Sequence, residues 1–519
     1  MTSIKTRYLA SVATGLAMLA MPALGQDITI QSVDGNSSLS GRLVSFDGEN
    51  YELDSVIGRL TIPVASVVCI GDACPQIDDG SLTASVGVLD KPSMALLSGL
   101  IDAFAQDQGL TLERDADALD ATQISLTDEG GDRFGDLSVV KSEQREAFLQ
   151  LLNGETKFVI STAPILDEIA EELIADGHAD LRAPGREVIV ALDAIVPVVH
   201  PTNTTRDMTL VTLARIAAGR VTNWNELGGP DLPIRMILTE DGSSIAGVFE
   251  ERIMRPNRLR LNRRLERVET EAEAAAIVAD DPAAITVTSN ALVETAKTLP
   301  VRQVCGPLSV PTNFSVKAEE YPLARRVLIY TSGEQLSESM KNFIAYAGST
   351  SAQTQYRNSG FVGQSVETVP MSLQGARLTS AILHADTPDL FESTRNLTET
   401  LTLADRLSTT FRFEPGSTTL DNKSRRDAVR IAQHLLLPEN KDREILLFGF
   451  TDSVGRSDLN QLLSLQQANS ISAAIIEASS GQIDKSRIQV TSYGAVAPVG
   501  CNDTVEGRNS NRRVEVWLR

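Results

Sequence analysis

The apolar residues of this 519-residue chain change their spacing along the sequence. They alternate with polar residues over residues 27–76, form strand-length and helix-length stretches from about 82 to 365, and take up a third pattern near 406. Apolar spacing limits which element a segment can form, because each element must bury one face. The length also exceeds what one hydrophobic core of ordinary size supports. The sequence therefore predicts several domains of different architecture.

Residues 1–25 have the features of a secretory signal peptide. Lys5 and Arg7 supply positive charge, and an apolar stretch rich in Ala and Leu follows. Ala23-Leu24-Gly25 is a small-residue cleavage site. An uncleaved anchor helix is the alternative, but the stretch is too short to span a bilayer and Pro22 ends it. No Cys follows the cleavage site, so we expect an exported mature protein without a lipid anchor.

Residues 26–78 predict a small antiparallel β domain of four or five strands. The turn signals Asp34-Gly35 and Asp47-Gly48 separate its short alternating runs. A domain of this size is marginal on its own core. Cys69 and Cys74 are therefore predicted to form a small stabilising disulfide loop in an oxidising compartment.

Residues 80–365 predict an α/β domain. Strand-like runs such as 158–161 and 188–199 alternate with helix-like stretches such as 95–104 and 165–174. Alternation of this kind favours helices packed on substantially parallel sheets.

The net charge of −21 argues against nucleic acid, or an anionic membrane, as a partner, because a polyanion is repelled over most of the surface. The charge is uneven. Residues 406–519 hold fifteen Lys and Arg against thirteen Asp and Glu, a net charge of about +2, so the residues before them carry a net charge of about −23. This asymmetry indicates separate domains with separate partners.

The sequence contains no motif that indicates a metal site or an enzyme active site. The four histidines lie far apart and form no metal-binding spacing, so we expect no metal. The sequence has no nucleophile elbow, no phosphate-binding loop and no acid pair at a catalytic spacing, so we expect a non-enzymatic protein without cofactors. Cys305 and Cys501 either pair across domains or stay free; spacing does not decide between them.

Several motifs in the α/β region occur in a familiar order. They run from Ala191 to Asn203, through Gly219-Arg-Val-Thr-Asn-Trp224-Asn-Glu-Leu-Gly-Gly229, to Pro311-Thr-Asn-Phe-Ser and Ser359-Gly-Phe-Val362. Over nearly three hundred residues the chain resembles the phosphate-binding subunit of ABC importers. The resemblance implies a type-II periplasmic-binding-protein fold, in which two α/β lobes enclose a cleft.

The resemblance also implies an anion site built from hydroxyls and from backbone N–H groups at helix N-termini. Its candidate residues here are Ser93, Ser161, Thr162, Ser243 and Ser244. Ala163 stands where the family has Arg, and Ile245 where it has Thr. Losing the Arg weakens anion binding by about one to two orders of magnitude. Two alternatives stay open: a working cleft for phosphate or another small anion, and a binding fold used as a structural or protein-contact module.

Residues 366–405 are rich in Ser, Thr, Asp and Glu, and we interpret them as a linker. From about 406 to 519, short apolar strands alternate with two helix-period stretches, which predicts a βαβαββ layer of the α+β class.

The last segment resembles the OmpA C-terminal domain. The matching motifs are Phe413-Glu-Pro-Gly416, Gly449 to Gly455, Leu463-Ser464, Ser492-Tyr-Gly494 and Cys501 to Glu515. Their order and spacing agree over about 110 residues. The resemblance implies binding of the diaminopimelate in the peptidoglycan stem peptide, a zwitterion that needs one anionic and one cationic protein group.

The candidate wall-binding residues follow from that resemblance: Thr451, Asp452, Asn460, Gln467 and Arg512. Asp452 matches the residue that binds the ammonium group, although an Asp before a helix can also serve only as an N-cap. Gln467 stands where the family has its carboxylate-binding Arg, and Gln carries no charge. We expect weaker binding unless Arg456, Arg508 or Arg512 supplies the cation.

Together these observations predict a non-enzymatic envelope protein of the periplasm, associated with the cell wall and outer membrane. Its C-terminal domain would bind peptidoglycan, while its acidic two-lobed domain would meet a ligand or other envelope proteins. The alternative is a phosphate or oxyanion receptor of an ABC importer, held at the wall.

Overall fold

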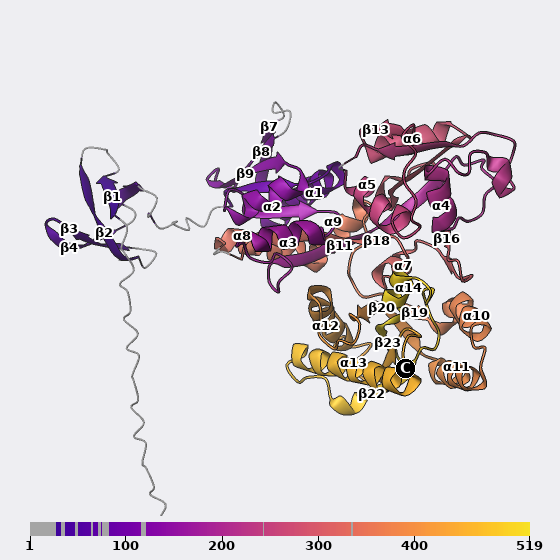
Figure 1. Ribbon diagram of the computed structural model, residues 1–519. Coiled ribbons are helices and arrows are strands. Elements are labelled where there is room, and N and C mark those ends of the chain that lie inside the picture. The colour runs from indigo at the N-terminus through magenta and orange to yellow at the C-terminus, as the bar shows by residue number, and fades with distance from the viewer. Residues whose placement is uncertain are drawn as a thin grey trace, which may run out of the picture. The chain divides into compact units, whose positions relative to one another are not determined.

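The chain forms two compact units, residues 1–79 and 80–519, which are described separately. The structure is a computed structural model (Figure 1). It describes residues 27–32, 37–46, 50–63, 66–70, 74, 82–115, 121–241, 243–333 and 336–519. The expected signal peptide lies outside the described residues.

The first unit is a five-stranded antiparallel sheet in the order β4-β3-β2-β1-β5. Its strands are β1 (Asp27–Ser32), β2 (Ser38–Phe46), β3 (Asn50–Ser55), β4 (Gly58–Pro63) and β5 (Val67–Ile70). Period-2 alternation turns Ile28, Ile30, Tyr51 and Leu53 to one small core. A disulfide joins Cys69 to Cys74 beside this core.

The second unit begins with a two-lobed α/β domain built on one long sheet. Its strand order is β13-β12-β14-β11-β18-β10-β6-β9-β8-β7, with β15 beside β11. The strand β11 (Glu187–Val199) belongs to both lobes, because its first part pairs with β18 (Ala324–Thr331) and its last part with β14 (Ala284–Ser289). Twelve of its thirteen residues are buried, as its continuous apolar run predicts.

The first lobe combines strands and helices from both ends of the domain. Its other strands are β6 (Ala84–Val88), β7 (Thr111–Asp115), β8 (Ala121–Thr127), β9 (Arg133–Lys141) and β10 (Phe158–Ser161). Its helices are α1 (Lys91–Gln108), α2 (Gln144–Leu152), α3 (Asp167–Ala175), α8 (Glu338–Ala347) and α9 (Thr350–Asn358). Asp90 caps α1, and Gly109 ends it in the left-handed conformation.

The second lobe contains β12 (Arg235–Thr239), β13 (Glu266–Val268), β15 (Lys297–Thr298), β16 (Val301–Arg302) and β17 (Leu308–Ser309). Its helices are α4 (Leu210–Ala217), η2 (Trp224–Leu227), α5 (Ser244–Phe249), η3 (Glu250–Met254), α6 (Glu271–Asp280), η4 (Asn290–Leu292) and α7 (Asn313–Lys317). The predicted two-lobed α/β architecture is confirmed.

The C-terminal domain is a five-stranded sheet in the order β19-β20-β23-β21-β22. Its strands are β19 (Thr368–Pro370), β20 (Asp405–Arg412), β21 (Ile445–Phe450), β22 (Ile488–Gly494) and β23 (Arg513–Leu518). The helices that follow β20, β21 and β22 are α12 (Asn422–Leu435), α13 (Ser457–Ala478) and α14 (Val505–Asn511), with η6 (Lys485–Arg487) before β22. The predicted βαβαββ order is present, with α14 as an addition that its polar sequence does not signal.

Residues 366–405, interpreted from composition as a linker, are folded in the structure. They form β19, η5 (Met371–Gln374), α10 (Gly375–Leu383) and α11 (Pro388–Leu401). The buried side of α11 presents Leu397 and Leu401, which join Phe448 and Trp517 in one apolar cluster. Most of the polar residues that suggest a linker lie on the outer side of these helices, although Thr394 of α11 is buried.

Over the described residues, no helix combines the length and the apolar character needed to cross a bilayer.

Candidate functional site

The loop between β21 and α13 carries Thr451 and Asp452. Asp452 Oδ1 accepts a hydrogen bond of 2.8 Å from the backbone N–H of Val454, which fixes the carboxylate within its own turn. Asn460 Nδ2 donates to the carbonyl oxygens of Asp452 and Val454, at 3.2 and 3.0 Å. Gly449 lets α13 approach β21, because a Cβ there would lie 2.1 Å from the Ser464 carbonyl oxygen.

Arg512 supplies a cation beside this carboxylate. Its Nη1 lies 2.6 Å from Asp452 Oδ2, and its Nε donates to the Phe413 carbonyl oxygen at 3.2 Å. The two side chains are only 6% and 12% exposed, so the pair lies at the inner end of the loop. A buried charge of one sign is costly, whereas a hydrogen-bonded pair of opposite charges is tolerated. The site therefore holds one anionic and one cationic group in direct contact.

The other two arginines considered from the sequence lie elsewhere. Arg456 pairs with Asp458 on the surface at 2.6 Å. Arg508 Nη1 donates to the Asn502 carbonyl oxygen at 2.8 Å and so supports the neighbouring loop.

Gln467 is fully buried on α13. Its Nε2 donates to the Ser417 carbonyl oxygen at 2.8 Å, which ties α13 to the turn after Phe413. Gln467 Oε1 and Thr451 Oγ1 have no hydrogen-bond partner among the described residues. The structure thus joins Asp452, Asn460 and Arg512 by direct contacts, while Gln467 contacts a different segment.

A second loop, formed by residues 499–502, supports the first and has no role assigned from the sequence. Asn502 Oδ1 accepts from the backbone N–H of Ser453 at 3.1 Å, directly beside Asp452. The buried Asn511 donates to Asn502 and accepts from the backbone N–H groups of Val499 and Gly500. Asn502 and Asn511 belong to the quoted C-terminal motif, so the signal was present, but their contact partners are not readable from spacing.

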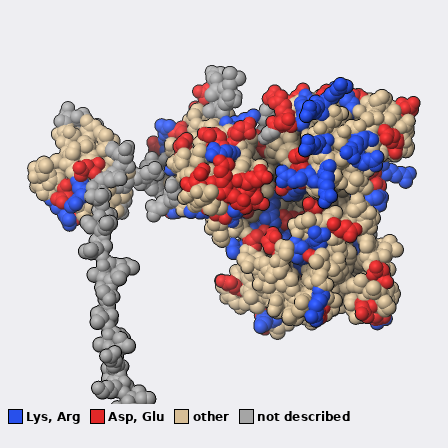
Figure 2. Space-filling model, in the orientation of Figure 1, with Lys and Arg blue, Asp and Glu red and all other residues tan. Residues whose placement is uncertain are grey.

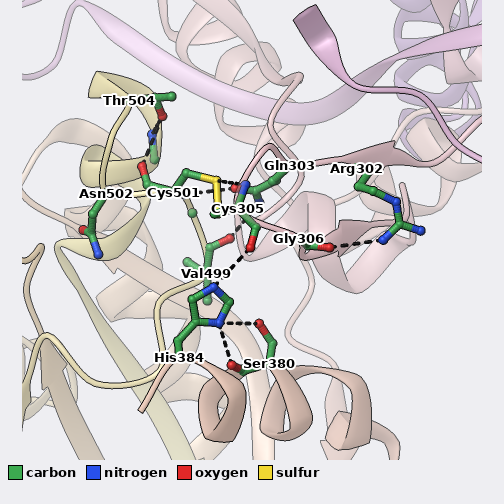
Figure 3. The surroundings of a disulfide bond; sticks show 12 residues. Arg302, Gln303, Cys305, Gly306, Ser380, His384, Val499, Cys501, Asn502 and Thr504 are labelled. Carbon is green, nitrogen blue, oxygen red and sulfur yellow. Dashed lines mark hydrogen bonds between the residues drawn. A yellow bond between two sulfur atoms is a disulfide. The ribbon is translucent and has the colours of Figure 1, made fainter. Parts of the chain in front are cut away.

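A disulfide between Cys305 and Cys501 joins this second loop to the two-lobed domain. Figure 3 shows Gln303 and Cys305 facing Cys501 and Val499. His384, the residue directly after α10, lies below them. Gln303 donates to the Val499 carbonyl oxygen at 2.9 Å and accepts from Cys501 N at 3.0 Å. The 305–501 pairing, left open by the sequence, therefore connects the second lobe to the loop beside Asp452.

Buried charges form a second connection between the two domains. Arg406 of β20 is fully buried, and its Nη2 lies 2.5 Å from Glu320 Oε1 of the two-lobed domain. Burial raises the pKa of Glu320, but Arg406 and Arg377 outweigh it and lower that pKa to about 2. The pKa of Glu515 is also lowered. Burial raises it, but the positive charges of Arg377, Arg406 and Arg513 have the larger effect and hold it well below its usual value.

A third connection lies at the start of α12. Arg326 of β18 pairs with Asp421 at 2.9 Å and with Glu319 at 2.7 Å. Asn422 Nδ2 donates to the Arg182 carbonyl oxygen of the first lobe at 3.0 Å. The C-terminal domain is thus held to both lobes.

The expected anion cleft contains a carboxylate of the protein itself. Asp90 Oδ1 accepts from the backbone N–H and the hydroxyl of Ser93, at 2.7 and 2.6 Å. Asp90 Oδ2 accepts from Thr162 Oγ1 at 2.6 Å. Thr162 Oγ1 also lies 3.2 Å from Ser244 Oγ of the second lobe. The hydroxyls of Ser93 and Thr162, which would donate hydrogen bonds to a bound phosphate, therefore already donate to Asp90.

Further charges are buried behind these hydroxyls. Arg325 Nε donates to Asp193 at 2.8 Å, and its Nη1 donates to Ser244 Oγ at 3.3 Å. Glu271 accepts from the backbone N–H of Ser289 at 2.9 Å, and burial raises its pKa to about 7. The buried group between the lobes thus contains the acidic side chains of Asp90, Asp193 and Glu271 beside Arg325.

The remaining two candidate residues serve local turns. Ser161 Oγ donates to the Ala163 carbonyl oxygen at 2.5 Å. Ser243 caps α5 by accepting from the backbone N–H of Ala246, at 3.2 Å, and lies 2.6 Å from Thr239 Oγ1. Of the five hydroxyls predicted for the cleft, those of Ser93, Thr162 and Ser244 come together.

The fold joins a two-lobed α/β domain to an α+β domain that holds the buried Asp452–Arg512 pair. The family description "PBP superfamily domain" matches residues 85–351, which is more than half of the chain, and the "OmpA family" matches residues 412–512. The chain belongs to the PBP superfamily and carries an OmpA-family domain at its C-terminal end. Both families consist of binding and structural proteins.

Similar proteins match one region or the other. The probable lipoprotein YiaD of Escherichia coli is 36% identical over 106 residues, covering 20% of this chain and 46% of that protein. The phosphate-binding protein PstS of Borreliella burgdorferi is 22% identical over 231 residues, covering 41% of this chain and 75% of that protein. The chain thus spans less than half the length of YiaD.

Among solved structures, an ABC-type phosphate transport receptor from Vibrio cholerae is 18% identical with a TM-score of 0.40. That match covers 53% of this chain and 98% of the receptor.

Proposed function

We propose that this chain is a non-enzymatic envelope protein that attaches to peptidoglycan through its C-terminal domain and displays a two-lobed binding-protein domain in the periplasm. The Asp452–Arg512 pair is the observation that carries the proposal. Diaminopimelate presents an ammonium and a carboxylate on one centre. A zwitterion can exchange partners with a preformed ion pair without leaving either buried charge alone, because it brings both signs.

Retention of the full chain by purified sacculi tests this function. The chain is expected to pellet with sacculi at low salt, and free diaminopimelate-containing peptide is expected to compete it off. If the chain stays in the supernatant at every salt concentration, the proposed attachment to peptidoglycan is wrong, and the C-terminal domain resembles the OmpA family in fold only.

Gln467→Arg is expected to strengthen wall binding, by up to about tenfold, because a guanidinium can donate two charge-assisted hydrogen bonds to the ligand carboxylate. The measurement is the fraction of chain bound to sacculi over a range of sacculus concentrations. Gln466→Arg is the matched control, since it adds the same charge one residue away on the exposed side of α13. Equal gains from both variants would show that only net charge had changed.

The cleft supports a scaffold role better than a solute-receptor role. Asp90 already occupies the hydroxyls of Ser93 and Thr162. A phosphate dianion entering there would meet a carboxylate of like charge, which disfavours binding. We therefore propose that the two-lobed domain contacts other envelope proteins rather than delivering phosphate to an importer.

Calorimetric titration of the full chain with inorganic phosphate is expected to give no saturable heat up to about 1 mM phosphate. Asp90→Thr is the informative companion, because it removes the competing carboxylate while keeping a residue that can cap α1. Saturable micromolar binding by the parent chain would instead support the alternative function, an oxyanion receptor tethered at the wall.

A further inference from the structure

The segment from Arg252 to Arg267 is unusual in this acidic chain. It holds seven arginines, no lysine and a single acidic residue, Glu266, within sixteen residues. The whole chain carries a net charge of −21. A local excess of one sign against such a background needs a physical explanation.

Packing directs the arginines of this segment outward. Leu259, Leu261 and Leu265 pack against the core of the two-lobed domain. Arg258 and Arg260 alternate with these leucines and are exposed, as are Arg255, Arg263 and Arg264. Within the described part of the chain, the side chains of these five arginines form no ion pair and no hydrogen bond. By contrast, the neighbouring Arg235 and Arg267 pair with Glu266 and Asp241.

Two further arginines extend the same surface. The backbone N–H of Asn262 donates to the Ala217 carbonyl oxygen at 2.9 Å, which holds the segment against the end of α4. Arg215 and Arg220, both exposed, flank that end. A hollow of about 480 Å³ opens there between Gly219, Asn262 and Arg264. We define the arginine face as Arg215, Arg220, Arg255, Arg258, Arg260, Arg263 and Arg264.

The first lobe carries an excess of negative charge, opposite to that of the arginine face. Residues 84–186 contain twenty Asp and Glu against eight Lys and Arg. Figure 2 shows basic residues gathered over the part that holds α4 and β13, and acidic residues over the part that holds α2 and α3. The domain is therefore polarised, so a charged partner would meet it in one orientation.

We propose that the arginine face docks the two-lobed domain onto the phosphate headgroups of an anionic lipid bilayer. Arginine suits this partner because its planar fork binds phosphate oxygens in pairs and remains charged at every physiological pH. Each arginine close to an anionic leaflet contributes about 1 kcal/mol. The whole-chain charge disfavours such a surface on average, but it also keeps the other faces away from the membrane.

One observation favours a lipid surface over nucleic acid, and a second makes docking on a membrane compatible with attachment to the wall. The segment 252–267 has no Phe, Tyr or Trp on which a nucleic acid base could stack. In Figure 1, β13 and α4 lie apart from α13 and β22 of the C-terminal domain. A chain held to the wall by its C-terminal domain could therefore present the arginine face to a membrane at the same time.

Co-sedimentation of the full chain with lipid vesicles tests this proposal. The parent is expected to bind vesicles of phosphatidylglycerol and phosphatidylcholine, but not of phosphatidylcholine alone, at about 50 mM salt, and to be released as salt shortens the screening length. The triple variant Arg258→Glu, Arg260→Glu, Arg263→Glu is expected to bind at least tenfold more weakly. The matching triple Arg→Lys variant is expected to retain most of the binding.

Arg133→Glu, Arg145→Glu, Arg395→Glu is the control, because these exposed arginines lie on the first lobe and on α11, outside the arginine face, and the same charge is changed. It is expected to bind like the parent, and all variants are expected to share the parent's thermal unfolding curve. The proposal is overturned if the parent ignores anionic vesicles, if the control loses binding as fully as the face variant, or if duplex DNA is bound while vesicles are not.

Discussion

Asp452→Asn is expected to release the chain from purified sacculi, lowering its affinity by about ten- to a hundredfold, because it removes a charge-assisted hydrogen bond to the ligand ammonium. The substitution keeps the side-chain shape and an oxygen that can accept from Val454 N–H. It also leaves Arg512, only 6% exposed, without its carboxylate partner. The measurement is a binding curve of full chain against sacculi at low salt.

Asp458→Asn is the matched control. Asp458 lies six residues further on, in the first turn of α13, but it is exposed and pairs with Arg456. Exposed pairs of this kind contribute at most about 1 kcal/mol to stability, so the control is expected to fold and bind like the parent. If Asp452→Asn pelleted as well as Asp458→Asn, the assignment of the wall site to Asp452 would be wrong.

Glu320→Gln is expected to loosen the joint between the two domains and to lower the free energy of unfolding by about 3 kcal/mol, because it leaves the fully buried Arg406 with one charged partner fewer. Urea unfolding, followed by circular dichroism with Cys305–Cys501 oxidised, measures this change. On reduction of that disulfide the two-lobed domain and the C-terminal domain of the variant are expected to unfold in separate steps.

Glu392→Gln provides the comparison, since Glu392 is 54% exposed and pairs with Arg395 on the outer side of α11. Its unfolding is expected to match that of the parent to within about 0.5 kcal/mol. A change as small for Glu320→Gln would mean that the Arg406–Glu320 contact does not hold the domains together.

The sequence predicts those features that depend on local spacing. The burial of β11 follows from its continuous apolar run. The position of Asp452 between β21 and α13 follows from a motif whose order and spacing are preserved. The fold of α11 was also accessible, because Leu390, Leu397 and Leu401 fall on one side of a helix, but its many Ser and Thr residues obscure that pattern.

The features that cannot be predicted from the sequence depend on contacts between residues that are far apart in the chain. Cys305 and Cys501 are separated by 196 positions, and Arg406 and Glu320 by 86, so no local pattern relates them. The capture of the cleft hydroxyls by Asp90 also requires the structure, because Thr162 lies 72 positions away. Asp90 also caps α1, which is a common role of an Asp at the start of a helix.

The buried carboxylate of Asp452 and the buried guanidinium of Arg512 are expected to bind the two opposite charges of diaminopimelate. Calorimetric titration of the full chain with two stem peptides, one containing diaminopimelate and one containing lysine in its place, tests it most directly. The lysine peptide keeps the ammonium but lacks the second carboxylate, so it is expected to bind at least about tenfold more weakly. Equal binding of the two peptides, or no binding of either, would contradict recognition by the Asp452–Arg512 pair.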